Sequence, residues 1–299
     1  MGRWAKLGGV NHSEHKLAAA DGTPLHVEVW RPEAPAKFAV LMSHGGAEHV
    51  GRYARVAADL VADGGVVFGP DHRGLGRSGG VRGHVKSFED YGRDLRTVML
   101  DQAGRGPAEE RPQNLPWFVF GHSMGGLIEL VYLLDHEKEI PLRGAIISSP
   151  LLGLTMKVNP LKLAVGKIAG ALAPKLSLPS GIPADAICRD PEEVARYVAD
   201  PLRVPVVTAG WFAAMNAAIA RVEHEAAKIE LPCLWYVGTD DRIVDHTATQ
   251  RVFAGFPRVA DRDQTLRAFE GYYHELHNEP EHLRKPVLAM IRSWIAEHL

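Results

Sequence analysis

The sequence predicts an α/β fold in which a mostly parallel central sheet carries helices on both faces and an inserted helical cap lies above it. Two observations predict the sheet: short apolar segments of strand length recur along the chain, and segments with helical spacing separate them. Strands that alternate with helices favour parallel pairing. A third observation predicts the cap, because this alternation stops at Pro150 and resumes only in the last third of the chain.

Seven segments are expected to be strands. Residues 25–32 alternate apolar and polar side chains and end at a proline, as a half-buried strand does. Most of the others are short apolar runs, the pattern of a strand that is buried on both faces. These further segments are residues 38–44, 66–72, 116–121, 144–150, 231–238 and 263–271.

Five segments between and after these strands are expected to be helices. Residues 53–65 have helical spacing and end at glycines, and residues 88–100 are amphipathic. Residues 124–136 are mostly apolar, which favours a central, buried helix. Residues 245–256 and 285–299 complete the set, the latter as a closing helix.

Residues 150–206 are predicted to form the cap, or lid, over the active site of a core made of residues 1–149 and 207–299. Six further prolines follow Pro150 before Leu202, and this region contains no buried-strand pattern. Its apolar side chains suggest a tunnel for an acyl chain, and its lysines suit transient contact with an anionic membrane surface. The simpler alternative is that this face packs on the core. The residues concerned are Leu161, Leu163, Val165, Ile168 and Leu172, with Lys157, Lys162, Lys167 and Lys175 among them.

The length, composition and net charge of the chain limit which classes of protein it can belong to. The 299 residues are 46% apolar and 23% charged, which is ordinary for a globular protein with a sizeable core. A formal net charge of −2 speaks against nucleic-acid binding. Cys188 and Cys233 are far apart in sequence and are expected as free, buried thiols. Residues 1–16 lack the apolar core of a signal peptide, and no apolar run reaches bilayer length, so a cytoplasmic protein is expected.

The residues 118–127, FVFGHSMGGL, place one serine among glycines between a predicted strand and a predicted helix. Gly-x-Ser-x-Gly in this setting is the nucleophile elbow. Gly121 and Gly125 leave room for a tight turn that lifts the hydroxyl of Ser123 above the sheet. The N-terminus of the following helix favours negative charge that develops there.

A nucleophilic serine needs a base and an acid that orients the base. In α/β-hydrolases the acid and then the histidine follow the serine along the chain, each in a loop after a strand. Asp240, Asp241 and Asp245 follow one predicted strand, and His274 and His277 follow the next. Both the order and the positions fit.

The reaction also needs an oxyanion hole. One donor is expected to be the backbone N–H of Met124, the residue after the nucleophile. The second is expected from the loop after the strand at residues 38–44, which contains two adjacent glycines. No metal-binding histidine pattern occurs and this chemistry needs no metal, so neither a metal nor a cofactor is expected.

Five motifs together resemble the monoacylglycerol lipase and lysophospholipase branch of the serine α/β-hydrolases. The motifs are HGGAEHVGRY (44–53), DHRGLGRSGG (71–80), GHSMGG (121–126), GTDDRIVD (238–245) and YYHELHNE (272–279). They cover most of the core, whereas the cap resembles the family only in position and character. The resemblance implies an α/β-hydrolase fold and hydrolysis of lipid esters without a cofactor.

Carried over by motif, the resemblance implies Ser123 as the nucleophile, Asp241 as the acid and His274 as the base. Gly46 and Met124 correspond to the two oxyanion donors. Asp240 is adjacent to Asp241 and should point the other way in an extended segment.

Further positions have secondary roles. Asp245 is expected to cap the next helix, and Ala47 stands where the family usually has the second glycine of His-Gly-x-Gly. Glu48, Arg52 and His277 correspond to the family's glycerol-binding positions, His277 being interpreted as a neighbour of the base.

The predicted function is hydrolysis of a small lipid ester through an acyl-enzyme, with monoacylglycerol as the expected substrate. A carboxylesterase for short esters would share every catalytic residue, and a lysophospholipase would differ in its head-group pocket. A non-catalytic binding module on this fold is the alternative from another class. Such a module usually lacks one of the three triad residues, whereas this sequence contains Ser123, Asp241 and His274. The sequence makes no prediction of oligomeric state.

Overall fold

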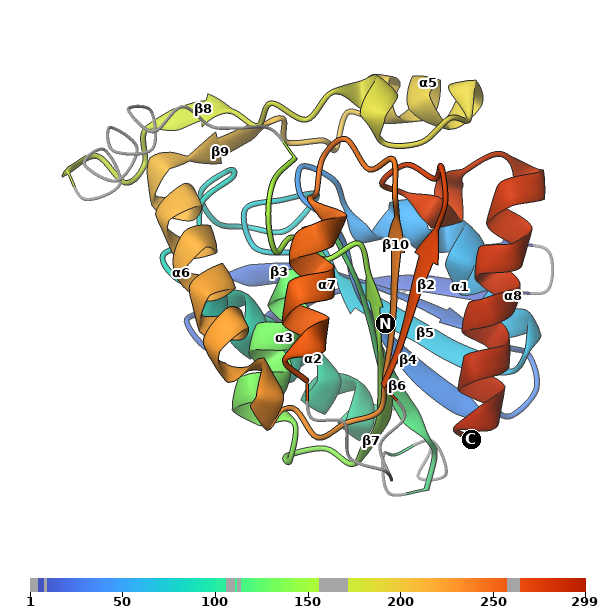
Figure 1. The fold of residues 1–299 in the computed structure, drawn as a ribbon. Coiled ribbons are helices and arrows are strands. Elements are labelled where there is room, and N and C mark those ends of the chain that lie inside the picture. Colours follow the sequence, from blue (N-terminus) through green and yellow to red (C-terminus); the bar gives the residue numbers. More distant parts are fainter. Residues whose placement is uncertain (1–4, 8–9, 106–110, 112–113, 156–171, 257–263) are drawn as a thin grey trace.

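The structure is a computed structural model that describes residues 5–7, 10–105, 111, 114–155, 172–256 and 264–299 (Figure 1). Within these residues the chain forms one large twisted sheet with helices packed against both of its faces. The predicted α/β-hydrolase fold is confirmed.

The sheet has nine strands in the order β1-β2-β3-β5-β4-β6-β7-β10-β11. Pairing is antiparallel from β1 to β5 and parallel from β5 to β11, so the sheet is mostly parallel as predicted. The strands are β1 (Ala5–Leu7), β2 (Val10–Ala18), β3 (Pro24–Arg31), β4 (Phe38–Ser43), β5 (Gly65–Pro70), β6 (Trp117–His122), β7 (Leu142–Ser148), β10 (Cys233–Gly238) and β11 (Gln264–Phe269).

All seven predicted strands are present, and β1 and β2 were not predicted. The sequence of β2 is VNHSEHKLA, and much of it stays exposed at the antiparallel edge of the sheet. A strand at such an edge needs few apolar residues, so its sequence lacks the signal that marks the buried strands.

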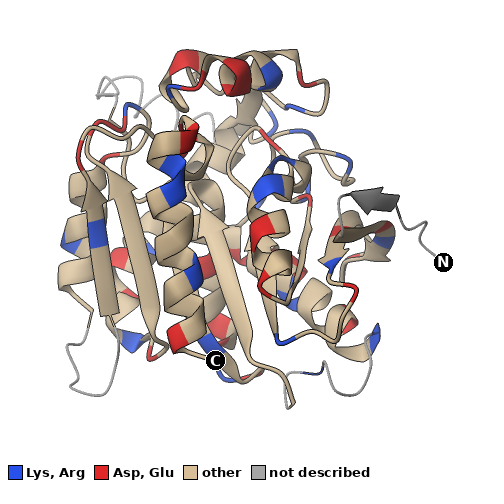
Figure 2. Ribbon diagram, turned by 90° about the vertical axis from the view of Figure 1, so that its right-hand side faces the viewer, with Lys and Arg blue, Asp and Glu red and all other residues tan. Residues whose placement is uncertain are grey.

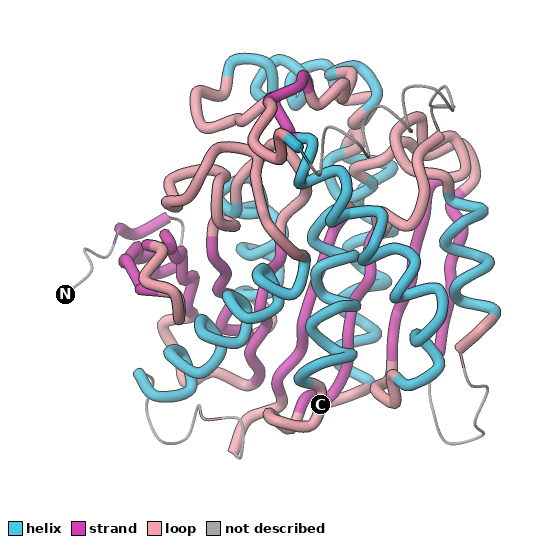
Figure 3. The backbone as a smooth tube through the Cα atoms, turned by 90° about the vertical axis from the view of Figure 1, so that its left-hand side faces the viewer, coloured by secondary structure: helices cyan, strands magenta, loops and turns pink. Residues whose placement is uncertain are grey.

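Helices cover both faces of the sheet (Figure 3). Two hydrophobic clusters enclose the sheet between these helices. One cluster packs α1 (Ala54–Ala62) and α8 (Glu281–Glu297) on one face. The other face carries four helices. They are α2 (Phe88–Arg105), α3 (Met124–His136), α6 (Ala209–Glu225) and α7 (His246–Ala254). The five predicted helices are present, and α6 is a further helix that was not predicted.

The inserted segment crosses the end of the core where the parallel strands finish (Figure 1). Its described part contains β8 (Ser177–Pro179), the short 3-10 helix η3 (Ala184–Ala186) and α5 (Pro191–Ala199). The strand β8 pairs with β9 (Val206–Thr208), which leads into α6. The predicted apolar and lysine-rich stretch falls largely on residues 156–171, outside the described residues.

Side-chain ion pairs and a hydrogen bond hold α5 against the core. Arg52 and Arg55 both contact Glu193 of α5, at 3.5 and 3.6 Å. The ring of His49 hydrogen-bonds Asp200 directly after the helix at 2.8 Å. Charged side chains of both signs lie on this helix and beneath it (Figure 2).

The remaining short helices are η1 (Val50–Tyr53), η4 (Ala226–Lys228) and η5 (Leu276–Asn278). Cys188 and Cys233 are free and buried, as predicted. None of the helices that the structure describes combines the length and apolar composition needed to cross a bilayer.

Candidate active site

Ser123 lies in the turn between β6 and α3, the strand–turn–helix placement that the motif predicts. Its backbone φ is +56°, in the left-handed region that side chains rarely occupy, so this turn stores strain. The flanking glycines are sterically required. A Cβ on Gly121 would lie 2.6 Å from the carbonyl oxygen of Gly125, and one on Gly125 would lie 2.1 Å from that of Ser43.

Two backbone segments approach each other beside this turn. Met124 is the first residue of α3, where a helix leaves its N–H groups without an intrahelical acceptor. Gly46 follows β4, and a Cβ on it would be 3.9 Å from the Cβ of Met124. Gly46, Ser123 and Met124 line one cavity. This arrangement can accommodate an oxyanion between the two segments.

His274 and Asp241 form a buried pair. Nδ1 of His274 donates a hydrogen bond of 2.7 Å to Oδ2 of Asp241. The other carboxylate oxygen of Asp241 accepts the N–H groups of Ile243 and Val244, each at 2.8 Å, which fixes its orientation. Because Nδ1 carries the proton, Nε2 of His274 keeps a lone pair that can accept one.

The two adjacent acids point in different directions, as expected for an extended segment. Asp240 is exposed, whereas Asp241 is buried against His274. Asp245 accepts the N–H of Thr247 and caps α7, which confirms that expectation.

The environment of His274 favours its protonated form. Burial alone would lower the pKa of His274, but the charge and hydrogen bond of Asp241 raise it above its ordinary value. His274 and Ser123 line the same small cavity, so a proton can pass between them in a reaction. An imidazolium formed there is stabilised by the neighbouring carboxylate.

The cavity beside Ser123 and Met124 is predominantly apolar, with its wall shared between core and inserted segment. It contains about 110 Å³ of space. Its apolar side chains are Ala47, Leu75, Tyr91, Met124, Leu151, Leu154, Ile182, Val206, Val207, Trp211, Phe212, Met215 and Ile243. Such a lining suits an extended hydrocarbon chain.

A second, polar cavity meets the first at Ser123. Glu48, Glu275, His122 and Tyr197 line it together with His274. Of the three residues expected to bind glycerol, only Glu48 is part of this wall. His277 is buried, the side chain of Arg52 is 6% exposed, and both lie outside the set of residues that line it.

Arg52 contacts three of the residues that line the polar cavity. Its guanidinium forms two hydrogen bonds with Glu275, at 2.8 and 2.7 Å, and pairs with Glu48. It also lies over the ring of Tyr197, with 4.7 Å between Cζ and the ring centroid. Arg52 therefore positions two acids and one aromatic ring of the cavity.

The pKa values of the two acids beside Arg52 are shifted in opposite directions. Burial raises the pKa of Glu48 above its ordinary value. Burial acts on Glu275 in the same direction, but the charge and hydrogen bonds of Arg52 hold its pKa below the ordinary value. His277 stacks on Tyr53 with 5.2 Å between ring centroids, and burial lowers its pKa to about 4, so its ring is neutral.

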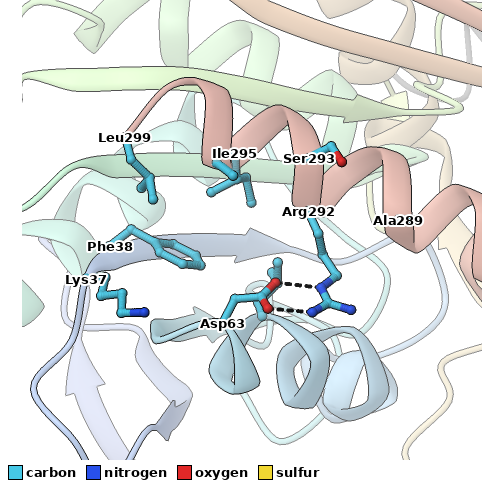
Figure 4. Close-up of a pocket in the computed structure, with 10 residues that line it drawn as sticks. Lys37, Phe38, Asp63, Ala289, Arg292, Ser293, Ile295 and Leu299 are labelled. Carbon is cyan, nitrogen blue, oxygen red and sulfur yellow. Dashed lines mark hydrogen bonds and ion pairs between the residues drawn. The ribbon is translucent and has the colours of Figure 1, made fainter.

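A larger cavity, of about 490 Å³, lies elsewhere (Figure 4). It is a groove between α1 and the end of α8, near Phe38 at the start of β4. Phe38 is the first residue of β4, whereas Ser123 follows the last residue of β6. Because β4 and β6 are parallel, the groove lies at the opposite end of these strands from Ser123. An ion pair of Asp63 with Arg292 borders it. Chemistry rather than volume therefore identifies the candidate site.

Ala47 is a second strained position. Its φ is +61°, which explains why a glycine is expected there. We predict that Ala47→Gly leaves kcat unchanged and raises the free energy of unfolding by about 0.5 kcal/mol, because relief of strain exceeds the added freedom of the unfolded chain. Urea denaturation of both proteins measures this difference. A loss of stability would show that Ala47 is unstrained.

Sequence reasoning missed Glu275, Tyr197 and His122 as wall residues. Glu275 and His122 adjoin motif residues in sequence, so their proximity to His274 and Ser123 could have been inferred. Tyr197 comes from α5, and only the folded position of the inserted segment brings it to the cavity.

Comparisons with known proteins show which family and which relatives the whole chain is similar to. A family model described as "Serine aminopeptidase, S33" matches residues 34–281. The monoacylglycerol lipase of Mycolicibacterium smegmatis is 37% identical over 291 residues, which cover 96% of this chain and 98% of the relative. Phospholipase YtpA of Bacillus subtilis is 31% identical over 272 residues, 90% of this chain and 99% of the relative.

A solved structure is also similar. The monoacylglycerol lipase of Paleococcus ferrophilus superposes with a TM-score of 0.80 at 29% sequence identity, covering 92% of this chain and 99% of that one.

Proposed function

The chain belongs to the monoacylglycerol lipase-like branch of the serine α/β-hydrolases, the family of the serine aminopeptidase S33 model, and from this premise we propose that it hydrolyses monoacylglycerols to a fatty acid and glycerol. One observation supports the reaction most directly. Ser123 borders both the apolar and the polar cavity, and His274, which is paired with the buried Asp241, borders the polar one.

The proposed acylation begins when Nε2 of His274 takes the hydroxyl proton of Ser123. Oγ of Ser123 then attacks the ester carbonyl, and the N–H groups of Gly46 and Met124 stabilise the oxyanion. His274 returns the proton to the glycerol oxygen as the carbon–oxygen bond breaks. Asp241 stays ionised and stabilises the imidazolium between these two transfers.

Deacylation repeats the same path with water in place of the serine hydroxyl. His274 takes a proton from water, hydroxide adds to the acyl-enzyme carbonyl, and Ser123 leaves with the proton from His274. The fatty acid is released and the resting state is restored. No cofactor takes part in this scheme.

The two cavities support an assignment of substrate ends. The acyl chain occupies the apolar cavity, and glycerol occupies the polar cavity beside Glu48, with Arg52 and His277 supporting its wall. Two acids face the head-group position, and the guanidinium of Arg52 is already paired with both. A phosphate would be repelled there, which favours glycerol over a lysophospholipid head group.

The proposal extends to the inserted segment, residues 150–206, as a cap over the acyl cavity. Leu172, Leu176 and Leu178 are exposed, with Lys175 among them, and Leu154 reaches both the surface and the cavity. Exposed leucines beside a lysine suit transient contact with a membrane that delivers the lipid. The protein would act as a cytoplasmic enzyme peripheral to that membrane.

Initial hydrolysis rates on one substrate panel test the proposal. The panel holds monoacylglycerols of short to long chain, a triacylglycerol, a lysophosphatidylcholine and short p-nitrophenyl esters, with Ser123→Ala as the control. We predict that monoacylglycerols give the highest kcat/KM and that the variant loses at least about 10³-fold. Activity confined to short activated esters would instead identify a general carboxylesterase. A preference for the lysophospholipid would contradict the charge argument at Glu48.

A further inference from the structure

Far from the serine, the antiparallel strands β2 and β3 place two histidines and two glutamates together. His12 and Glu14 are two residues apart on β2, so their side chains face the same side of the sheet. His26 and Glu28 are likewise two residues apart on β3 and share that side. The register sets Glu14 directly opposite Glu28. Two like charges in opposed positions destabilise a strand pair unless a cation lies between them.

Several potential ligand atoms of these side chains lie close to one another. Nε2 of His12 is 2.9 Å from Oε2 of Glu28. Nε2 of His26 is 3.6 Å from Oε1 of Glu28 and 3.9 Å from Oε2 of Glu14. Ligand atoms of His12, Glu14 and Glu28 all lie within 4.8 Å of one another. Ligands bound about 2.1 Å from a tetrahedral ion lie roughly 3.4 Å apart, close to these separations.

The guanidinium of Arg77 lies beside three of these side chains. Its Nη1 lies 3.1 Å from Oε1 of Glu28, 3.8 Å from Oε1 of Glu14 and 3.2 Å from Nε2 of His26. A guanidinium only donates, so Nε2 of His26 accepts and its lone pair points inward. The side chain of Arg77 is 41% exposed and can turn outward into water.

The inner side of the cluster also meets an imidazole. His49 is buried and its Nδ1 has no hydrogen-bond partner, while its Nε2 contacts Asp200. Ligand atoms of Glu28, His49 and Asp71 lie within 4.8 Å of one another. A buried carboxylate with imidazoles on two sides is suited to a cation.

We propose that His12, Glu14 and Glu28 bind a divalent transition-metal ion of the zinc class, with Arg77 as the cation that pairs with the two glutamates in the metal-free protein. One imidazole nitrogen and two carboxylate oxygens, with water as the fourth ligand, form a donor set that suits zinc. The ion joins β2 to β3 and stabilises the exposed edge of the sheet. It takes no part in ester hydrolysis, so the proposal is independent of the substrate.

Titration of the tag-free full chain with ZnCl₂, followed by calorimetry and by thermal unfolding, tests the site. Wild-type protein should bind one equivalent, and its Tm should rise by about 5 °C at saturating zinc. The double variant His12→Ala, Glu14→Gln should lose at least about tenfold in affinity. Arg77→Ala should bind about tenfold more tightly, because the competing cation is gone.

The matched control is His15→Ala, since His15 lies on β2 but bonds Asp101 instead of the cluster. It should bind zinc as the wild type does. Unchanged hydrolysis of a p-nitrophenyl ester verifies that each variant is folded. The proposal is overturned if neither wild-type protein nor Arg77→Ala binds zinc stoichiometrically. Equal binding by the double variant would also overturn it, by locating zinc elsewhere.

Discussion

Replacement of Asp241 by asparagine is expected to lower kcat for monoacylglycerol hydrolysis by about 10⁴-fold. The asparagine oxygen can still accept the N–H groups of Ile243 and Val244, so its amide N–H would face His274. Nδ1 of His274 would then accept, the proton would move to Nε2, and the ring could no longer act as a base toward Ser123.

The same variant is expected to shift the pH profile. Asp241 raises the pKa of His274 in the wild type, and the catalytic base must be neutral to act. Removing the negative charge lowers that pKa, so the acidic limb of kcat/KM moves to lower pH. Steady-state rates across the pH range measure both effects.

The adjacent acid supplies the control for this experiment. Asp240→Asn changes an exposed residue of the same loop and should keep wild-type kcat and pH dependence. A comparable loss in both variants would show that the loop, and not the Asp241 carboxylate, is responsible. A loss below tenfold in Asp241→Asn would remove Asp241 from the proposed mechanism.

Replacement of Glu129 by methionine is expected to stabilise the protein by about 2 kcal/mol at pH 8. Glu129 lies in α3 beneath the elbow, 1% exposed, and neither of its carboxyl oxygens has a hydrogen-bond partner. A Cβ on Gly121 would lie 2.3 Å from its Oε2, which shows how closely the carboxyl approaches the turn. Methionine fills a similar volume without an orphaned polar group.

This gain depends on pH in a defined direction. Burial raises the pKa of Glu129 well above its ordinary value, so the native state retains a proton that the unfolded chain releases. The free energy of unfolding therefore falls as pH rises above the unfolded-state value, up to the raised native value. The advantage of Glu129→Met should be small at pH 4 and grow toward pH 8.

Thermal and urea unfolding at several pH values measure this advantage. Glu129→Gln removes the ionisation but keeps a polar group, so it should flatten the pH dependence with a smaller gain. Glu223→Gln, on an exposed position of α6, should follow the wild type. Parallel curves for wild type and Glu129→Met would show that Glu129 has a partner in solution.

The core was predictable because its parallel strands are buried on both faces and therefore read as apolar runs. The elbow was predictable because its steric requirement for glycine is local to five residues. The choice between Asp240 and Asp241 was also local, since neighbouring residues in an extended segment point apart.

Features that depend on pairing between distant segments were not predictable. Glu129 has helical spacing like any other residue of α3, and only the packing of that helix on β6 buries its carboxyl. Arg52 was expected at the substrate, but in the folded chain Glu48, Glu275 and Glu193 surround its guanidinium. The opposition of Glu14 and Glu28 depends on the register of β2, a strand that the sequence did not reveal.

The strand order governs how the chain is assembled during its synthesis on the ribosome. β7 pairs with the preceding strand β6 on one side, but it gains its second partner, β10, only when Cys233–Gly238 has been made. Until then a half-made chain presents the apolar β7 with one open edge, the kind of surface that chaperones cover. Ser123 precedes β10 in the chain, so it is synthesised long before the sheet around it is complete.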